Sequence, residues 1–244
     1  PGTVAGISRA HQSFGKVGWN DLLKPAVQQA KQGLEVDWYA ALIIASATRA
    51  LSADPDAAAM FLEDGQWPTI AGWTALSQKR ISMSKIADTL SQLGEAGAQD
   101  FYTGDIAAAM VKDVQDKGGF LSMEDLAAYN IDFEQPLEIP YRGSRILATP
   151  TLTAGPTLAH TLQQLEEQFT PGQTPDATTF ASYASALQTS YNHRLSTMGD
   201  QDAPNAPSCT THFSIVDRHG NMVCMTQTLL SLFGSRVVSP STGF

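Results

Sequence analysis

Charge is scarce in this 244-residue sequence, and the charge that is present leans to the acidic side. Charged residues make up 16% of the chain, with 24 acidic against 15 basic side chains and a net charge of −9. The lysines and arginines are scattered, so the sequence offers no basic stripe for a phosphate backbone. We therefore expect no nucleic acid among its partners.

Long apolar runs are also missing. The longest covers residues 38–47 and falls well short of the ~20 residues that a bilayer-spanning helix needs. We therefore expect no membrane segment. With 43% hydrophobic residues, the composition is still that of a globular protein with a substantial core.

Groups that bind metals and cofactors are sparse. The five histidines show no paired ligand spacing, and no glycine-rich segment is followed by Lys-Ser or Lys-Thr as in a phosphate loop. The only two cysteines, Cys209 and Cys224, flank a predicted hairpin but are offset along it, so we expect no easy cross-strand disulfide. We predict neither a metal nor a cofactor.

The sequence does contain a helix-rich first two-thirds, followed by strands. Apolar residues at helical spacing, with turn residues between them, predict an α+β protein with one structural domain. We expect Asn20 to be an N-cap, Gly94 to stop a helix, and Ser122 and Asp125 to form a capping box. The predicted segments are helices from about 3–14, 20–32, 36–51, 82–93, 104–117, 126–129, 156–169 and 180–198, and strands within 136–149.

A hairpin is predicted near the carboxyl end. Residues 211–216 alternate between two faces, which predicts a half-buried strand, and a turn near His219 leads into the β-branched run 222–228. An antiparallel register about this turn places Thr228 opposite Thr210. A polar, proline-broken leader at about 199–209 comes directly before Thr210, and such segments are accessible.

This arrangement of an accessible leader and a threonine at the start of a strand suggests that Thr210 is a nucleophile. A threonine hydroxyl is a poor nucleophile unless a base lies beside it, and a free α-amine on the same residue is such a base. Cleavage between Cys209 and Thr210 would create that amine. Thr228 would orient the Thr210 hydroxyl, whereas strand alternation points Thr211 to the other face.

Several motifs resemble the γ-glutamyltranspeptidase (glutathione hydrolase) family of amino-terminal nucleophile hydrolases. They include Thr-Thr-His-Phe-Ser-Ile-Val-Asp at 210–217, with further matches at 1–6, 101–107, 118–119, 124–129, 141–143, 220–221, 226–228 and 233–235. The resemblance implies a four-layer αββα fold and autocatalytic cleavage of a zymogen before Thr210. It also implies transfer or hydrolysis of γ-glutamyl groups, as in glutathione, through an ester on that threonine.

The resemblance further implies an organisation of the chain. Residues 1–209 would be large-subunit-like, and residues 210–244 would begin a small subunit whose remainder is the missing partner of this chain. We expect the chain to be a fragment, inactive alone, because the family's upstream arginine, substrate-binding aspartate and serine pair, and oxyanion glycine pair lie outside it. A periplasmic or secreted location is implied by the family alone.

Two other functions are compatible with the sequence. Where the family has an asparagine that holds the γ-glutamyl carboxylate, this chain has Leu230, so a related acylase with a changed acyl pocket is a second reading, and a binding protein that retains the fold without turnover is a third. His212, Ser214 and Asp217 suggest a catalytic triad. They lie on or next to a single strand, however, so we favour a structural role for them.

Overall fold

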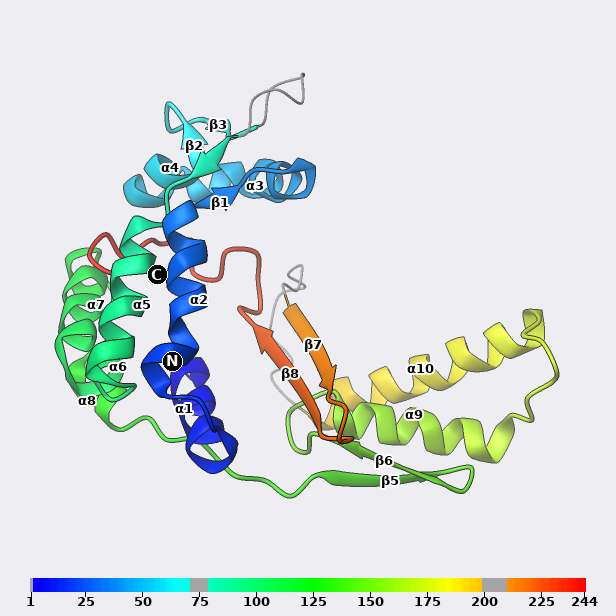
Figure 1. Ribbon diagram of the computed structural model, residues 1–244. Coiled ribbons are helices and arrows are strands. Elements are labelled where there is room, and N and C mark those ends of the chain that lie inside the picture. The colour runs from blue at the N-terminus through cyan, green and yellow to red at the C-terminus, as the bar shows by residue number, and fades with distance from the viewer. Residues whose placement is uncertain (1, 71–78, 199–209) are drawn as a thin grey trace. The chain divides into compact units, whose positions relative to one another are not determined.

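The computed structural model describes residues 2–70, 79–198 and 210–244, and it confirms the α+β class (Figure 1). The chain divides into two compact units, one formed by Pro1–Ile131 with Ala206–Phe244 and the other by Asp132–Asn205. The sequence had suggested one structural domain. The predicted division into regions 1–209 and 210–244 refers to cleavage of the chain and not to its compact units, and it stays a prediction.

Helices form most of the first unit, with short strand pairs between them. β1 (Leu34–Glu35) pairs with β4 (Arg80–Ile81), and β2 (Leu62–Glu63) pairs with β3 (Trp67–Pro68), both antiparallel. The helices are α1 (Gly2–Phe14), α2 (Trp19–Gln32), α3 (Trp38–Leu51), α4 (Pro55–Phe61), α5 (Ser84–Ala96), α6 (Asp100–Thr103), α7 (Asp105–Asp116) and α8 (Met123–Ala127).

Polar side chains start several of these helices. Asp37 and Asp54 accept hydrogen bonds from the amides of Ala40 and Ala57 at the first turns of α3 and α4. The predicted capping box at Ser122 and Asp125 is confirmed at the start of α8. These caps fix where the helices begin and therefore how their apolar faces meet.

Two expected helix boundaries were wrong. Asn20 is not an N-cap, because α2 begins one residue earlier, after Gly18. Gly94 does not end α5, which continues to Ala96 and is followed by Gly97. A side chain at Gly94 would lie 2.8 Å from Asn20 Oδ1, so the glycine allows α5 to pack closely against α2.

The core of the first unit consists of three clusters. One centres on α3 and α4 and includes Ile44 and Leu51, a second joins α5 to α6 and α7 through Leu93 and Ile106, and a third places Leu126 of α8 against α7. Within the described ranges, none of the helices combines the length and the hydropathy that a bilayer span requires.

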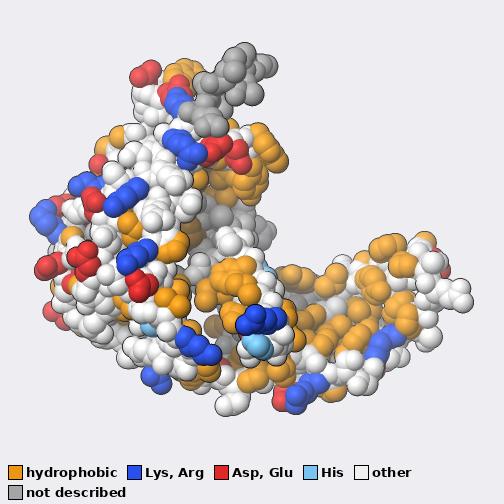
Figure 2. Space-filling view, viewed as in Figure 1, with side chains coloured by type: hydrophobic (Ala, Val, Ile, Leu, Met, Phe, Trp, Pro, Cys, Tyr) orange, Lys and Arg blue, Asp and Glu red, His pale blue; other side chains and the backbone are white. Residues whose placement is uncertain are grey.

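The second unit contains a hairpin and two long helices. β5 (Leu137–Tyr141) and β6 (Ser144–Ala148) turn at Arg142 and Gly143 as predicted, and they are followed by α9 (Gly155–Gln168) and α10 (Ala177–Thr197). Hydrophobic side chains gather over α9 and α10 (Figure 2). Five large residues of α10 are exposed at intervals of three or four positions: Phe180, Tyr183, Leu187, Tyr191 and Leu195.

The carboxyl-terminal hairpin consists of β7 (Thr210–Val216) and β8 (Met222–Thr228) (Figure 1). Its register pairs Thr210 with Thr228, as predicted from the sequence. The prediction of a half-buried strand was wrong, because every residue of β7 is exposed. In the described part of the chain β7 and β8 pair only with each other, so no further strand extends their sheet.

Candidate active site

The amino end of β7 and the carboxyl end of β8 bring two threonine hydroxyls together. Thr210 Oγ1 donates a hydrogen bond to Thr228 Oγ1 over 2.9 Å. The antiparallel register makes these residues direct partners, so both side chains lie on one face of the hairpin. With its proton directed at Thr228, the Thr210 oxygen can present lone-pair density to an electrophile.

A backbone amide also contacts this pair. The N–H of Leu230 donates to Thr228 Oγ1 over 3.0 Å, so this oxygen accepts from both Thr210 and the backbone. Leu230 has φ +66°, in the left-handed region that favours glycine and asparagine, and its side chain is 76% exposed. The side chain of Leu230 is visible in the sequence, but this contact of its amide is not, because backbone conformation after a strand leaves no clear sequence signal.

Polar side chains continue along the face that carries Thr210. His212 hydrogen-bonds through Nδ1 to its cross-strand partner Thr226 at 2.7 Å and through Nε2 to Ser214 at 3.1 Å. Cys224, an exposed free cysteine, lies across from Ser214 and donates to it over 3.5 Å. The imidazole therefore ties the strands of the hairpin together.

Asp217 has a separate role in the turn between the strands. Its carboxylate accepts from the amides of His219 and Asn221 and from the Asn221 side chain, at 2.8 to 2.9 Å. The hydrogen bonds from Asn221 lower the pKa of Asp217 and keep the turn acceptor ionised. His212 thus bonds Ser214 and Thr226 while Asp217 serves the turn, an arrangement that favours the structural reading of this trio.

Cys209, the acyl-side residue of the expected cleavage, lies outside the described residues, as does the whole leader at 199–209. Within the parts of the chain that are described, no group of three or more His, Cys, Asp or Glu side chains is arranged to hold a metal ion.

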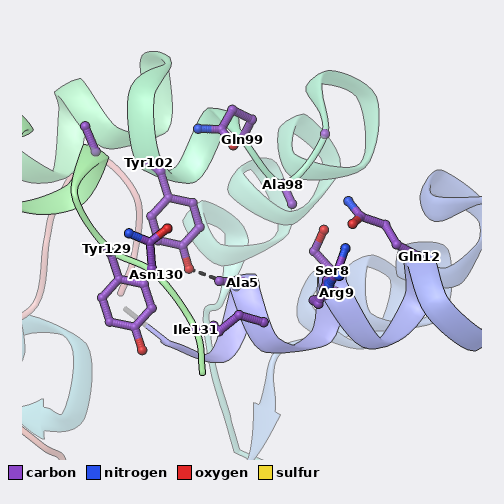
Figure 3. A pocket seen from close by; sticks show the side chains of 12 residues that line it. Ala5, Ser8, Arg9, Gln12, Ala98, Gln99, Tyr102, Tyr129, Asn130 and Ile131 are labelled. Atoms are coloured by element: carbon purple, nitrogen blue, oxygen red, sulfur yellow. Dashed lines mark hydrogen bonds between the residues drawn. The ribbon is translucent and has the colours of Figure 1, made fainter. Parts of the chain in front are cut away.

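The first unit also contains a cavity of about 380 Å³ between α1, the start of α6 and the segment after α8. Figure 3 shows Tyr102 and Tyr129 on one side of it, with Ser8, Arg9 and Gln12 on the other. The Ala5 amide donates to Tyr102 Oη over 2.8 Å, and burial raises the pKa of this phenol. Neither Thr210 nor Thr228 is among its described lining residues, so this cavity is not part of the threonine site.

Comparisons with known proteins agree with the motifs. Glutathione hydrolase 2 of Arabidopsis thaliana is 27% identical over the whole chain, which covers 48% of that protein. The crystal structure of Helicobacter pylori gamma-glutamyltranspeptidase matches with a TM-score of 0.73 and 26% identity, covering 85% of this chain and 58% of that one. The cephalosporin acylase of Bacillus halodurans shares the fold, with a TM-score of 0.81 at 22% identity, covering all of this chain and 50% of that one.

The chain spans about half the length of the curated relatives it matches. The family model described as gamma-glutamyltranspeptidase matches residues 1–209 and 205–244, which together cover the whole sequence. Because this match extends over both compact units and the threonine hairpin, the chain belongs to the gamma-glutamyltranspeptidase family.

Proposed function

We propose that this chain carries the nucleophile of a γ-glutamyltransferase or glutathione hydrolase that activates itself by cleavage before Thr210. The observation that carries the proposal is the 2.9 Å hydrogen bond between Thr210 and Thr228 at the open end of the hairpin. Membership of the gamma-glutamyltranspeptidase family supports it.

The proposed self-cleavage is an N-to-O acyl shift. Thr210 Oγ1 attacks the carbonyl carbon of Cys209, the peptide C–N bond breaks, and the hydroxyl proton passes to the departing nitrogen of Thr210. Water then opens the ester, which leaves a carboxylate on Cys209 and restores the hydroxyl of Thr210. Thr228 orients the attacking oxygen in this step.

Turnover uses the amine that cleavage creates. With an ordinary pKa of about 7.7 to 8.0, the α-amine of Thr210 takes the hydroxyl proton as Oγ1 attacks the substrate amide, and it returns the proton to the leaving amine. Water or an acceptor amine then resolves the acyl ester. The substrate is a γ-glutamyl amide such as glutathione, and the remainder of the small subunit supplies the oxyanion donors.

The same proposal includes the surroundings of the site. The complete protein would have the four-layer αββα arrangement, in which further strands cover the hairpin that is exposed here. Residues 1–209 would then act as a large subunit and residues 210–244 as the start of the small one. A periplasmic or secreted location accompanies this assignment.

The experiment compares Thr210→Ala with Thr211→Ala in the complete protein. Amino-terminal sequencing of any smaller subunit should find Thr210 first in the parent, and Thr210→Ala should lose both cleavage and turnover. Thr211 is the matched control, because the register pairs it with Gln227 rather than with Thr228. A subunit that starts elsewhere, or an uncut protein with full activity, contradicts the proposal.

A second candidate is an acylase whose acyl pocket is changed. The supporting observation is Leu230, an exposed apolar residue two positions after Thr228 whose amide contacts the Thr228 hydroxyl. Hydrolysis of a panel of γ-glutamyl and glutaryl anilides separates the two candidates, since an acylase would prefer the acyl group without the α-amino acid head. A protein that is never cut and hydrolyses none of the panel is a binding protein of the same fold.

A further inference from the structure

Residues 233–244, which we call the anchor segment, follow the threonine hairpin and contact α4, α5, α6 and α7 of the first unit. Phe233 packs against Phe61 of α4, with ring centroids 5.0 Å apart. Thr89 of α5 donates to the carbonyl oxygen of Thr242 over 2.8 Å. Phe101 of α6 and Asp113 of α7 make the remaining contacts.

Asp113 is a buried carboxylate, 6% exposed, that accepts hydrogen bonds from the anchor segment. Ser239 Oγ donates to its Oδ2 at 2.5 Å, the Ser241 amide donates to the same oxygen at 2.8 Å, and Ser241 Oγ donates to Oδ1 at 2.9 Å. Thr242 Oγ1 donates in turn to Ser239 Oγ at 2.7 Å. A buried charge is costly unless donors surround it, so α7 and the anchor segment depend on each other.

A second buried carboxylate contacts the same segment. Asp54, the N-cap of α4, accepts from the Val238 amide at 3.2 Å as well as from the amide of Ala57 at 2.8 Å. Lys117 Nζ lies 2.6 Å from Asp54 Oδ2 and 2.6 Å from Asp56. The anchor segment is thus hydrogen-bonded to two carboxylates that belong to different helices.

Close packing completes the contact. Gly243 has φ +79°, and a Cβ there would lie 2.8 Å from the backbone nitrogen of Ile86. The Phe244 ring meets Phe101 edge to face, with centroids 5.7 Å apart. Substitution at Gly243 is therefore opposed by both conformation and space.

The hairpin itself contrasts with the anchor segment. All residues of β7 are exposed, and His212 on its Thr210 face bonds to Thr226 of β8 and to Ser214 of β7 itself. Cleavage before Thr210 would remove the peptide link between the hairpin and residues 1–209. The contacts of the anchor segment would then help to hold the hairpin on the helices.

We propose that the anchor segment is the interaction surface that retains the nucleophile-bearing peptide on the helical unit after the chain is cut, with Asp113 as its central acceptor. The partner is the chain's own cleaved carboxyl-terminal part. This inference rests on the proposed cleavage. It goes further by assigning retention to the hydrogen bonds that Ser239 and Ser241 donate to the buried carboxylate of Asp113.

The test cuts the chain without relying on Thr210. A recognition sequence for a specific protease replaces residues 201–207 of the 244-residue chain, which carries an affinity tag at its amino end. After cutting, size-exclusion chromatography and intact-mass measurement follow how much of the carboxyl-terminal peptide stays with the tagged part. The parent should retain it, and Asp113→Ala should release it at least about tenfold faster, since hydrogen bonds to a charged group are lost.

Asp116→Ala is the matched control, because Asp116 is an exposed carboxylate on the same helix whose partner is Lys112. Circular dichroism of each uncut variant reports whether it folds. If Asp113→Ala does not fold, Ser241→Ala removes one bond to Asp113 from an exposed position and should speed release severalfold.

Two results overturn the inference: immediate release from the cut parent, or retention by the Asp113 and Ser241 variants equal to that of the parent. Failure of self-cleavage is a separate outcome, because the added protease cuts whether or not Thr210 is a nucleophile. The anchor assignment and the proposed function can therefore fail independently.

Discussion

At the scale of single residues, the site depends on how one hydroxyl is oriented by another. Thr228 Oγ1 accepts from the Thr210 hydroxyl and from the Leu230 amide, so its position is fixed from the strand and from the loop that follows. The identity of residue 228 should therefore affect the rate of attack, whereas the identity of residue 230 should affect stability and substrate choice.

Replacing Thr228 with valine removes the hydroxyl partner while keeping the branched shape. We expect self-cleavage of the complete protein to slow by roughly tenfold or more, because a hydrogen bond that orients the nucleophile is lost. Gel densitometry of precursor against time measures it. Thr226→Val, which removes a hydroxyl bonded to His212 on the same face, is the control, and Thr228→Ser should recover most of the rate.

Replacing Leu230 with asparagine should relieve backbone strain. A leucine at φ +66° is disfavoured, and asparagine tolerates this region, so the free energy of unfolding should rise by about 0.5 to 1 kcal/mol. In the complete protein, γ-glutamyl anilide hydrolysis should also rise relative to glutaryl anilide hydrolysis. Leu229→Asn is the exposed neighbour used as control. An unchanged substrate ratio would argue that residue 230 does not select the acyl group.

At the scale of elements, local sequence patterns correctly predicted features that neighbouring residues determine, such as a hairpin register and a helix cap. The register that pairs Thr210 with Thr228 followed from the turn near His219, and the capping box followed from Ser122 and Asp125. The extent of α5 could not be predicted from local sequence. Gly94 lies inside this helix because α5 packs closely against Asn20 of α2, and that contact joins residues far apart in the sequence. The exposed hairpin was mispredicted because alternation indicates one apolar face without revealing whether another element of the chain packs on that face.

Gly155 at the first turn of α9 illustrates another contact that the sequence does not reveal. A Cβ at this position would lie 1.9 Å from the Thr149 carbonyl oxygen and 3.3 Å from Ala148 Cβ. Because backbone blocks the space, Gly155→Ala should destabilise the second unit by about 1 to 3 kcal/mol. Thermal unfolding followed by helical circular dichroism measures it.

Gly6 provides the matched control for that substitution. It lies within α1, and a Cβ there would meet nothing within 4 Å. Gly6→Ala should therefore stabilise the protein by up to about 1 kcal/mol, since alanine is the better helix former. Equal effects of the two substitutions on the unfolding temperature would show that the close approach at Gly155 does not destabilise an alanine there.

At the scale of the whole molecule, buried carboxylates link segments far apart in the sequence. Asp113 joins α7 to residues more than a hundred positions later, and Asp54 does the same for α4. Neither link could be predicted from sequence, because an aspartate in a polar helix pattern is normally a solvated charge. These two groups should also control how the first unit responds to acid.

Burial alone would raise the pKa of Asp113, but hydrogen bonds from Ser239 and Ser241 outweigh it, and Lys112 adds a favourable charge, so the pKa is lowered. Burial likewise opposes ionisation of Asp54, and its bonds from Lys117, Ala57 and Val238 again lower the pKa. The unfolded chain, with ordinary aspartate pKa values of about 3.9, then binds more protons in mild acid than the folded chain does. The stability that Asp113 and Asp54 contribute is therefore complete above the aspartate pKa of the unfolded chain, and it is lost as the pH falls below that pKa.

Urea unfolding between pH 3 and 6 tests this dependence for the first unit, because all four tryptophans lie between residues 19 and 73 and their fluorescence reports on that unit alone. Lys117, whose pKa is raised mainly by its bonds to Asp54 and Asp56 against the effect of burial, stays protonated throughout the range. We expect the urea midpoint of the parent to fall as the pH drops toward 3. Asp113→Asn should start lower and fall less steeply, because it has lost one of the titrating groups, whereas Asp116→Asn should follow the parent. Parallel curves for the parent and Asp113→Asn would mean that this carboxylate does not contribute to acid sensitivity.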